Sequence, residues 1–288
     1  MLKQIIKLVR VKQWYKNLLV FVPLFFAGNF FSTNIAPYIL GFVALSFVSS
    51  SYYIINDLKD VKEDRAHREK KKRPLASKKI TKSAAYIIMI ILLSIATIIS
   101  INIGYGFAIL AGTLFVATNA YIFYLKKIAF LDIIMISINF LIRTIAGAYI
   151  LSNTINPTIE ISPWLILCVF FLAIFLTASK READMKFLKD DAKKHKETLE
   201  KYDIETTNFI TSMSITMLIT VYSLYIILVK TPLFLITLPI TLYAIMRYYY
   251  LLKTQNQITR HPENFYKDKG LLISITLWII TTATLLYI

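Results

Sequence analysis

The chain has 288 residues, of which 57% are hydrophobic, and its mean hydropathy is +0.59. The apolar residues come in long blocks rather than at amphipathic spacing, which excludes an ordinary soluble domain and predicts a polytopic membrane protein. A net charge of +16 would suggest nucleic acid in a soluble protein, but the placement of the cations along the chain indicates another cause.

Nine apolar blocks are long enough, or nearly so, to cross a bilayer as helices. In chain order they lie at about residues 15 to 33, 38 to 57, 83 to 103, 105 to 125, 129 to 151, 161 to 180, 207 to 229, 231 to 252 and 269 to 288. We therefore expect an all-α membrane bundle of nine transmembrane helices, with residues 1–288 forming a single integral membrane domain.

The segments on alternate sides of these spans differ sharply in charge. All but two of the 33 Lys and Arg residues lie before the first span, in every second loop after it, or near the span ends that border these segments, and the exceptions are Arg143 and Lys230. By the positive-inside rule, the N-terminus and the long basic loops 58–82 and 181–206 face the cytoplasm of a cell (inner) membrane, and nine spans place Ile288 outside. Membrane topology accounts for the charge, so we expect no nucleic-acid binding.

An acidic series lies where the second apolar block meets the most basic stretch of the chain. Asp57, Asp60 and Asp64 are spaced three and four apart and would share one face of a helix, with Asn56 beside them. Clustered carboxylates stay ionised only beside a cation or strong donors, and Mg²⁺ prefers such oxygen ligands and can bind a diphosphate. The alternative is that Asp60 and Asp64 merely pair with neighbouring cations at a solvated helix end.

Cations that follow the acidic series are candidates for phosphate contacts. Arg65 adjoins Asp64, Arg73 is fixed by Pro74, and a guanidinium group can bind two phosphate oxygens at once. His67 is either a hydrogen-bond donor to a phosphate or a solvated loop residue. The lysines of this stretch are explained as well by topology and by contact with anionic headgroups.

A second polar group lies at the cytoplasmic end of the sixth span. Lys180, Arg181 and Asp184 would be costly at this depth unless they face a polar cavity. Asp184 is therefore a candidate metal ligand, and the two cations are candidates for neutralising phosphate. Glu182 points elsewhere on the helix and is expected to be solvated.

Arg143 lies farther from the ends of its span than any other cation, so it must face the bundle interior and meet an anion. We expect a bound ligand or a carboxylate of another span rather than Asp132, about three turns away. Gly147, one turn further on, is expected to allow close helix packing. Tyr53 is a candidate because it adjoins the acidic series. Donors in the N-terminal stretch, which suit either a lipid phosphate or an interfacial helix entry, are Lys12, Lys16 and Asn17.

Together these motifs resemble the UbiA superfamily of intramembrane prenyltransferases. The resemblance rests on Asn56 through Asp64, on nine spans and on a second polar motif after the sixth span. Common members have two aspartates in the second motif, whereas Lys180, Arg181 and Asp184 are similar to the decaprenyl-phosphate phosphoribosyltransferase branch. Further matches run along nearly the whole chain, among them Lys12, Gln13, Trp14, Lys16, Asn17, Tyr53, Arg65, His67, Arg73, Arg143, Tyr202 and Trp278.

The resemblance implies a cytoplasm-facing central cavity and a transferase that moves 5-phosphoribose from phosphoribosyl diphosphate to a polyprenyl phosphate. It implies that Mg²⁺ is held by Asp57, Asp60, Asp64 and Asp184, while Lys180 and Arg181 supply the cations that additional phosphates need. The alternative is transfer of a prenyl group from a prenyl diphosphate to an aromatic or other acceptor. The sequence leaves open whether copies of the chain form a homo-oligomer. Residues implied to bind substrate are Lys12, Lys16, Asn17, Tyr53, Asn56, Arg65, His67, Arg73, Arg143 and Tyr202.

Overall fold

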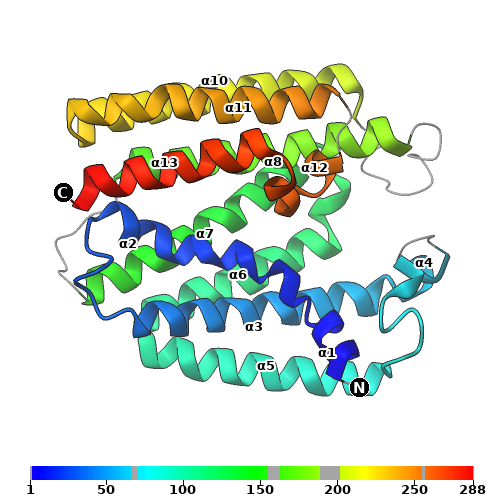
Figure 1. The fold of residues 1–288 in the computed structure, drawn as a ribbon. Coiled ribbons are helices and arrows are strands. Elements are labelled where there is room, and N and C mark those ends of the chain that lie inside the picture. Colours follow the sequence, from blue (N-terminus) through cyan, green and yellow to red (C-terminus); the bar gives the residue numbers. More distant parts are fainter. Residues whose placement is uncertain (1, 67–69, 155–161, 189–201, 255–256, 288) are drawn as a thin grey trace. The chain divides into compact units, whose positions relative to one another are not determined.

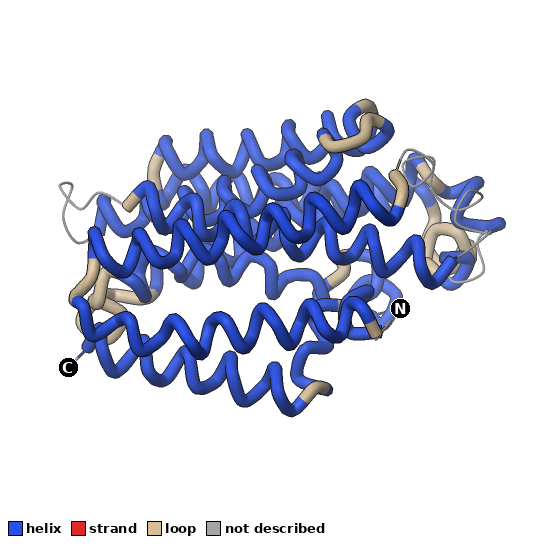
Figure 2. Tube along the Cα trace, turned by 90° about the horizontal axis from the view of Figure 1, so that it is seen from above, coloured by secondary structure: helices blue, strands red, loops and turns tan. Residues whose placement is uncertain are grey.

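The computed structural model describes residues 2–66, 70–154, 162–188, 202–254 and 257–287. Within these ranges every regular element is a helix, which confirms the all-α prediction (Figures 1 and 2). The chain divides into two compact units. The first comprises Met1–Phe25, Asn29–Leu125 and Ile142–Glu160, and the second comprises Phe26–Gly28, Lys126–Leu141 and Ile161–Ile288.

Eight helical segments among the described residues are long and apolar enough to cross a membrane, so the chain is a multi-pass membrane protein. One of them begins in a 3₁₀ turn, η6 (Pro232–Ile236), and continues as α11. The long helices are α3 (Ala36–Lys59), α5 (Lys82–Ile103), α6 (Tyr105–Phe123), α7 (Leu131–Thr154), α8 (Pro163–Leu188), α10 (Ile204–Val229), α11 (Thr237–Lys253) and α13 (Lys269–Tyr287). The short ones are α1 (Leu2–Leu8), α4 (Val61–Ala66), η2 (Lys70–Lys72), η3 (Leu125–Lys127), α12 (Gln257–Arg260) and η7 (Pro262–Lys267).

The ninth expected helix, over residues 15 to 33, is not among these eight. Instead, a 3₁₀ helix, η1 (Val11–Phe21), is followed by a short α-helix, α2 (Val22–Phe26). A 3₁₀ helix rises about 2 Å per residue and an α-helix about 1.5 Å, so the two together extend roughly 30 Å, about the thickness of a hydrocarbon core. Hydropathy reports the length of an apolar segment but not how tightly it winds, which is why the sequence suggested a single α-helix.

In the first unit, α3 is the central helix and packs against α5, α6 and η1 (Figure 1). Its buried face is rich in small residues, which let neighbouring helices approach closely. α5 has few buried residues and is capped at its N-terminus by Thr81, whose hydroxyl accepts a hydrogen bond from the backbone N–H of Ala84. Its exposed side chains are apolar, as expected of a helix that faces lipid, and include Ile87, Ile90, Ile91 and Ile98.

Gly147 of α7 sets the approach of that helix to η1 in the same unit. A Cβ atom at this position would lie 2.0 Å from the carbonyl oxygen of Val20. Only glycine fits this contact, because the atom it would meet belongs to the backbone and cannot rotate away. The expectation that Gly147 allows close packing is confirmed, and the neighbour is η1.

In the second unit, α8 packs along α10, and α11 packs along α13. An apolar cluster joins Phe175 of α8 to Leu218 of α10 and Ile245 of α11. Another cluster holds Ile133, at the start of α7, against Ile174 and Tyr202. These contacts fix the C-terminal end of α8, where the second polar motif lies.

Candidate active site

In the first unit, Asp57 and Asp64 lie close together and share one cation. Asp57 is in the last turn of α3, Asp64 is in α4, and both are buried. Nη1 of Arg73 donates to Oδ1 of Asp57 at 3.0 Å and to Oδ2 of Asp64 at 2.7 Å. Two of the acidic residues singled out in the sequence are therefore brought together, and Arg73 lies between them.

Arg10, which belongs to the same N-terminal stretch of donors as Lys12 and Lys16, supplies a second guanidinium to this group, a contact that the sequence did not suggest. Nη2 of Arg10 donates to the same Oδ1 of Asp57, and its guanidinium lies 4.6 Å from the centroid of the Tyr53 ring. The backbone of Arg10 is left-handed, with φ 52° and ψ 48°, where α1 gives way to η1. Nothing in the local sequence pairs Arg10 with Asp57, because the contact depends on how η1 folds back along α3.

Asp64 retains an unsatisfied acceptor. Among the described residues its Oδ1 is buried without a hydrogen-bond partner, and Nζ of Lys70 lies 3.9 Å from it. Burial raises the pKa of Asp64, and the adjacent Arg73 acts in the opposite direction. A further cation at Oδ1 would therefore be stabilising, and a carboxylate oxygen suits Mg²⁺.

Asp60 lies at a break between two helices, although its backbone N–H still donates to the carbonyl of Asn56 at 3.0 Å and its carbonyl accepts from the N–H of Asp64 at 2.8 Å. α3 ends at Lys59 and α4 begins at Val61, so Asp60 is the half-buried C-cap between them. Over the described ranges, no three acidic, histidine or cysteine side chains form a group that could hold a metal. A metal ion bound by Asp57 and Asp64 would therefore need further oxygen ligands, which a diphosphate could supply.

The other candidates of the first unit occupy different environments. Lys12 is exposed on η1, Lys16 is half-buried, and the Nε of the exposed Arg65 donates to the carbonyl of Ala76 at 3.3 Å. Asn56 is half-buried in the last turns of α3. His67 lies outside the described residues.

Arg143 is buried in the first unit against neutral oxygen acceptors. Its Nε donates to Oδ1 of Asn17 at 2.8 Å, and its Nη2 donates to the hydroxyl of Tyr52 at 2.8 Å. Nδ2 of Asn17 in turn donates to Oγ of Ser46 at 3.1 Å. Asn17 thus links η1, α3 and α7, a structural role that the sequence did not suggest.

In the second unit, Asp132 anchors Arg181 and Tyr202. Nε of Arg181 donates to Oδ2 of Asp132 at 3.0 Å, and the Tyr202 hydroxyl donates to Oδ1 at 2.5 Å. That hydroxyl also accepts a hydrogen bond from the backbone N–H of Phe130 at 2.6 Å. Burial raises the pKa of Tyr202 well above its ordinary value. Asp132, considered above as a partner of Arg143, therefore engages α8 and the segment before α10.

Glu182 is fully buried, so the expectation that it is solvated was wrong. Its Oε1 accepts from Nζ of Lys186 at 2.7 Å and from Nζ of Lys253 in α11 at 2.7 Å. Lys253 also donates to Oδ1 of Asn208 in α10 at 2.6 Å. The error has a plain cause: the partner Lys253 lies far along the chain, and spacing within α8 could not reveal it.

Asp184 is also paired, with Arg260 of α12, whose Nε lies 3.2 Å from Oδ1. Arg181, Glu182 and Asp184 therefore each attach the end of α8 to a different segment of the second unit. Lys180 begins this motif and is half-buried. The motif therefore contains cations on a helix end that ion pairs hold in place, an arrangement suited to binding phosphate.

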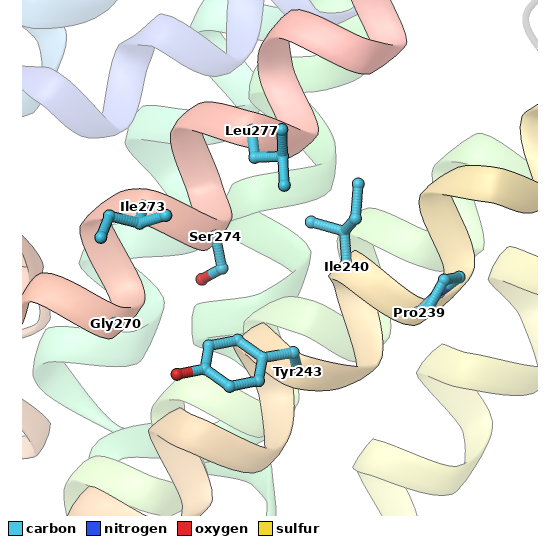
Figure 3. A pocket seen from close by; sticks show the side chains of 7 residues that line it. All are labelled: Pro239, Ile240, Tyr243, Gly270, Ile273, Ser274 and Leu277. Carbon is cyan, nitrogen blue, oxygen red and sulfur yellow. The ribbon is translucent and has the colours of Figure 1, made fainter.

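A groove of about 370 Å³ lies between α11 and α13 (Figure 3). Its lining is almost wholly apolar, and the hydroxyl groups of Tyr243 and Ser274 are its only side-chain polar groups. It contains none of the charged residues described above. The groove is therefore not the candidate active site.

Comparison with known proteins identifies the family. Residues 18–266 match the UbiA prenyltransferase family model. The decaprenyl-phosphate phosphoribosyltransferase of Mycolicibacterium smegmatis is 32% identical over 302 residues, which cover 98% of this chain and 92% of that protein. The protein of the same name from Corynebacterium glutamicum is 30% identical over 225 residues, which cover 76% of this chain and 66% of that protein.

Solved structures show the same fold. A UbiA homolog from Archaeoglobus fulgidus bound to GPP and Mg²⁺ has a TM-score of 0.74 at 16% identity, covering 99% of this chain and 100% of that chain. Digeranylgeranylglyceryl phosphate synthase has a TM-score of 0.69 at 22% identity, covering 99% of this chain and 98% of that chain. At these identities the likeness concerns the fold alone.

Proposed function

Because the chain belongs to the UbiA prenyltransferase family, we propose that this membrane transferase moves 5-phosphoribose from phosphoribosyl diphosphate to a polyprenyl phosphate, in a reaction that requires Mg²⁺. The observation that carries the proposal is the 32% identity to a decaprenyl-phosphate phosphoribosyltransferase over 98% of this chain and 92% of that relative. The second motif supports the same assignment. It contains Lys180, Arg181 and Asp184, whereas common members of the superfamily have two aspartates there.

The first unit would bind the diphosphate of the donor. Asp57 and Asp64 are the proposed Mg²⁺ ligands, with Asp60 as a further candidate, and the unsatisfied Oδ1 of Asp64 supports this assignment. Mg²⁺, when bound, would neutralise charge on the departing diphosphate. Arg73 orients both carboxylates and can turn its remaining N–H groups towards phosphate oxygens.

The transfer exchanges one bond to the anomeric carbon for another. The bond from C1 of the ribose to the diphosphate oxygen breaks, and diphosphate leaves with the electron pair. An oxygen of the lipid phosphate supplies the electron pair for the new bond to C1. Because a phosphate monoester is already anionic, no side chain is needed as a strong general base.

The second unit would bind a phosphate group of a substrate. Lys180 is the proposed direct contact, and Arg181 is held in place by Asp132. Tyr202, anchored on the same carboxylate, is a positioning residue in this proposal, although the sequence suggested substrate contact. Asp184 remains a candidate metal ligand. The substrate contacts expected of Lys12, Lys16, Asn17, Tyr53, Asn56, Arg65, His67 and Arg143 also remain proposals.

We also propose that the N-terminus and the loops with most cations face the cytoplasm of the cell (inner) membrane. The described residues contain eight long apolar helical segments. If the η1 and α2 segment also crosses, Ile288 lies outside. Single cysteines introduced into the termini and loops can be labelled with a membrane-impermeant reagent, which shows on which side of the membrane each segment lies. Labelling of both termini from the same side would contradict this topology.

The alternative function is transfer of a prenyl group from a prenyl diphosphate. Purified protein in nanodiscs should be incubated with Mg²⁺, phosphoribosyl diphosphate and polyprenyl phosphates of several chain lengths. The proposal predicts release of diphosphate and a lipid product heavier by one phosphoribosyl group in mass spectrometry. The absence of that product at every chain length, together with turnover of a prenyl diphosphate, would favour the alternative.

A further inference from the structure

Two guanidinium groups converge on a single atom, Oδ1 of Asp57. Arg10 reaches it from the junction of α1 and η1, and Arg73 reaches it from the basic segment after α4. The arginine side chains are 22% and 25% exposed, whereas that of Asp57 is 2% exposed. The cations therefore have access to solvent and to an incoming ligand, while the carboxylate is fixed within the protein.

Arg10 differs from Arg73 in how it is held. Its backbone is left-handed, at φ 52°. This conformation is unfavourable for any residue with a Cβ atom, and proteins tend to retain it at functional sites. Its guanidinium lies 4.6 Å from the centroid of the Tyr53 ring, a contact that does not use its N–H groups. Arg73 bridges two carboxylates, whereas the described ion pair of Arg10 is with Asp57 alone.

We propose that Arg10 competes with a divalent cation for Asp57 and transfers its hydrogen bonds to the diphosphate when cation and diphosphate bind together. The divalent cation at Asp57 and the identity of the ligand as a diphosphate both rest on the proposed function. A metal ion that takes Oδ1 of Asp57 displaces Arg10 from its acceptor and repels it, because both are positive. A diphosphate provides new anionic acceptors, and Arg10 can bind two of their oxygens while it stays over Tyr53.

This exchange predicts two opposite effects of removing the guanidinium. Divalent cations alone should bind more tightly, because their competitor at Asp57 is gone. Diphosphate should bind the metal-loaded protein more weakly, because one of its donors is gone. A residue that only maintained the fold would weaken both.

The test uses the full chain in nanodiscs, with Mn²⁺ binding followed by electron paramagnetic resonance and inorganic pyrophosphate as the second ligand. The main variant is Arg10→Asn, because asparagine tolerates the left-handed backbone. We expect it to bind Mn²⁺ alone roughly fivefold more tightly and to bind pyrophosphate at saturating Mn²⁺ roughly tenfold more weakly. Lys7→Ala, an exposed position of α1, is the control for loss of one positive charge and should change either affinity less than about twofold.

Tyr53→Leu provides a second variant that leaves the charge unchanged. It removes the aromatic ring that Arg10 contacts, so Mn²⁺ should bind more tightly and pyrophosphate more weakly, each by a smaller factor than in Arg10→Asn. Unchanged or weaker Mn²⁺ binding in Arg10→Asn, or unchanged pyrophosphate binding, would overturn the proposal. If the wild type binds Mn²⁺ and pyrophosphate in this way but does not turn over phosphoribosyl diphosphate, the inference stands and the proposed function fails.

Discussion

Asp57 and Asp64 share a single nitrogen atom as hydrogen-bond donor, Nη1 of Arg73, at 3.0 and 2.7 Å. One carboxylate closes a long membrane helix, and the other lies in the short helix that follows it. Arg73 therefore sets the distance between the two proposed metal ligands. Their positions depend on an ion-pair network of the first unit and not on helical spacing alone.

The first prediction concerns the pH dependence of Arg73→Ala. Burial raises the pKa of Asp64, and Arg73 opposes that effect, so the variant raises this pKa further. A raised carboxyl pKa means that stability falls as pH increases through it, because the buried group must then lose its proton. At pH 8 we expect the variant to lose about 3 kcal/mol of stability, and at pH 5 distinctly less.

Thermal unfolding of the detergent-solubilised protein at both pH values measures this difference. Arg65→Ala is the matched control, because Arg65 is exposed and its Nε donates to a backbone carbonyl. Equal losses for Arg73→Ala at pH 5 and pH 8 would show that Asp64 does not determine the effect.

The second prediction compares two glycines of the first unit. In Gly147→Ala the new methyl group would lie 2.0 Å from the carbonyl oxygen of Val20, whereas nothing lies within 4 Å of the corresponding atom in Gly112→Ala. We expect the first variant to unfold at a much lower temperature or fail to accumulate. The second should be neutral or more stable by up to about 1 kcal/mol, since alanine favours helix. Similar melting temperatures for the two variants would contradict the packing of η1 against α7.

The third prediction separates the adjacent cations Lys180 and Arg181. Arg181→Ala removes the cation that pairs with the fully buried Asp132 and should lower the melting temperature as well as activity. Lys180→Ala should mainly raise the KM for the phosphorylated donor, with the Mg²⁺ dependence nearly unchanged. Steady-state kinetics at varied donor and varied Mg²⁺ distinguish these effects. An unchanged donor KM and kcat in Lys180→Ala would exclude a phosphate contact there.

The fourth prediction concerns the metal ligands. Asp57→Asn and Asp60→Asn should each reduce turnover by at least about a hundredfold, as expected for loss of charge stabilisation at a leaving group. Both proteins should remain folded by circular dichroism. Mn²⁺ titration shows whether the loss of turnover accompanies a loss of metal binding. Near wild-type turnover in either variant would remove that residue from the proposed metal site.

Much of the fold could be predicted because membrane spans depend on local composition. Seven of the eight long apolar helical segments coincide with predicted blocks to within about three residues at each end, whereas α8 continues as a helix to Leu188, beyond the predicted end near residue 180. The segment from Val11 to Phe26 could not be predicted as a 3₁₀ and α combination, since hydropathy carries no information on winding. Its winding accompanies a tertiary contact, that of Val20 with Gly147.

Within the candidate site, the sequence identified the acidic and basic residues but not their pairings. Asp57, Asp64 and Arg73 are near one another in the chain, but the sequence suggested Mg²⁺ for the carboxylates and phosphate for Arg73, and not the ion pairs between them. The contact of Arg10 with Asp57 and that of Lys253 with Glu182 join distant segments, so no spacing rule could reveal them. Glu182 was misjudged for this reason.

The central claim is that an oxygen of the lipid phosphate attacks C1 of the ribose and displaces diphosphate. The most direct test follows which product receives the oxygen atom that joined C1 to the diphosphate. Phosphoribosyl diphosphate carrying ¹⁸O in the bridge between C1 and the diphosphate is incubated with the protein, Mg²⁺ and polyprenyl phosphate, and both products are analysed by mass spectrometry. Cleavage at C1 predicts that all of the ¹⁸O appears in released diphosphate and none in the phosphoribosylated lipid. Retention of ¹⁸O in a ribose-containing product, or failure to form the lipid product, would contradict the claim.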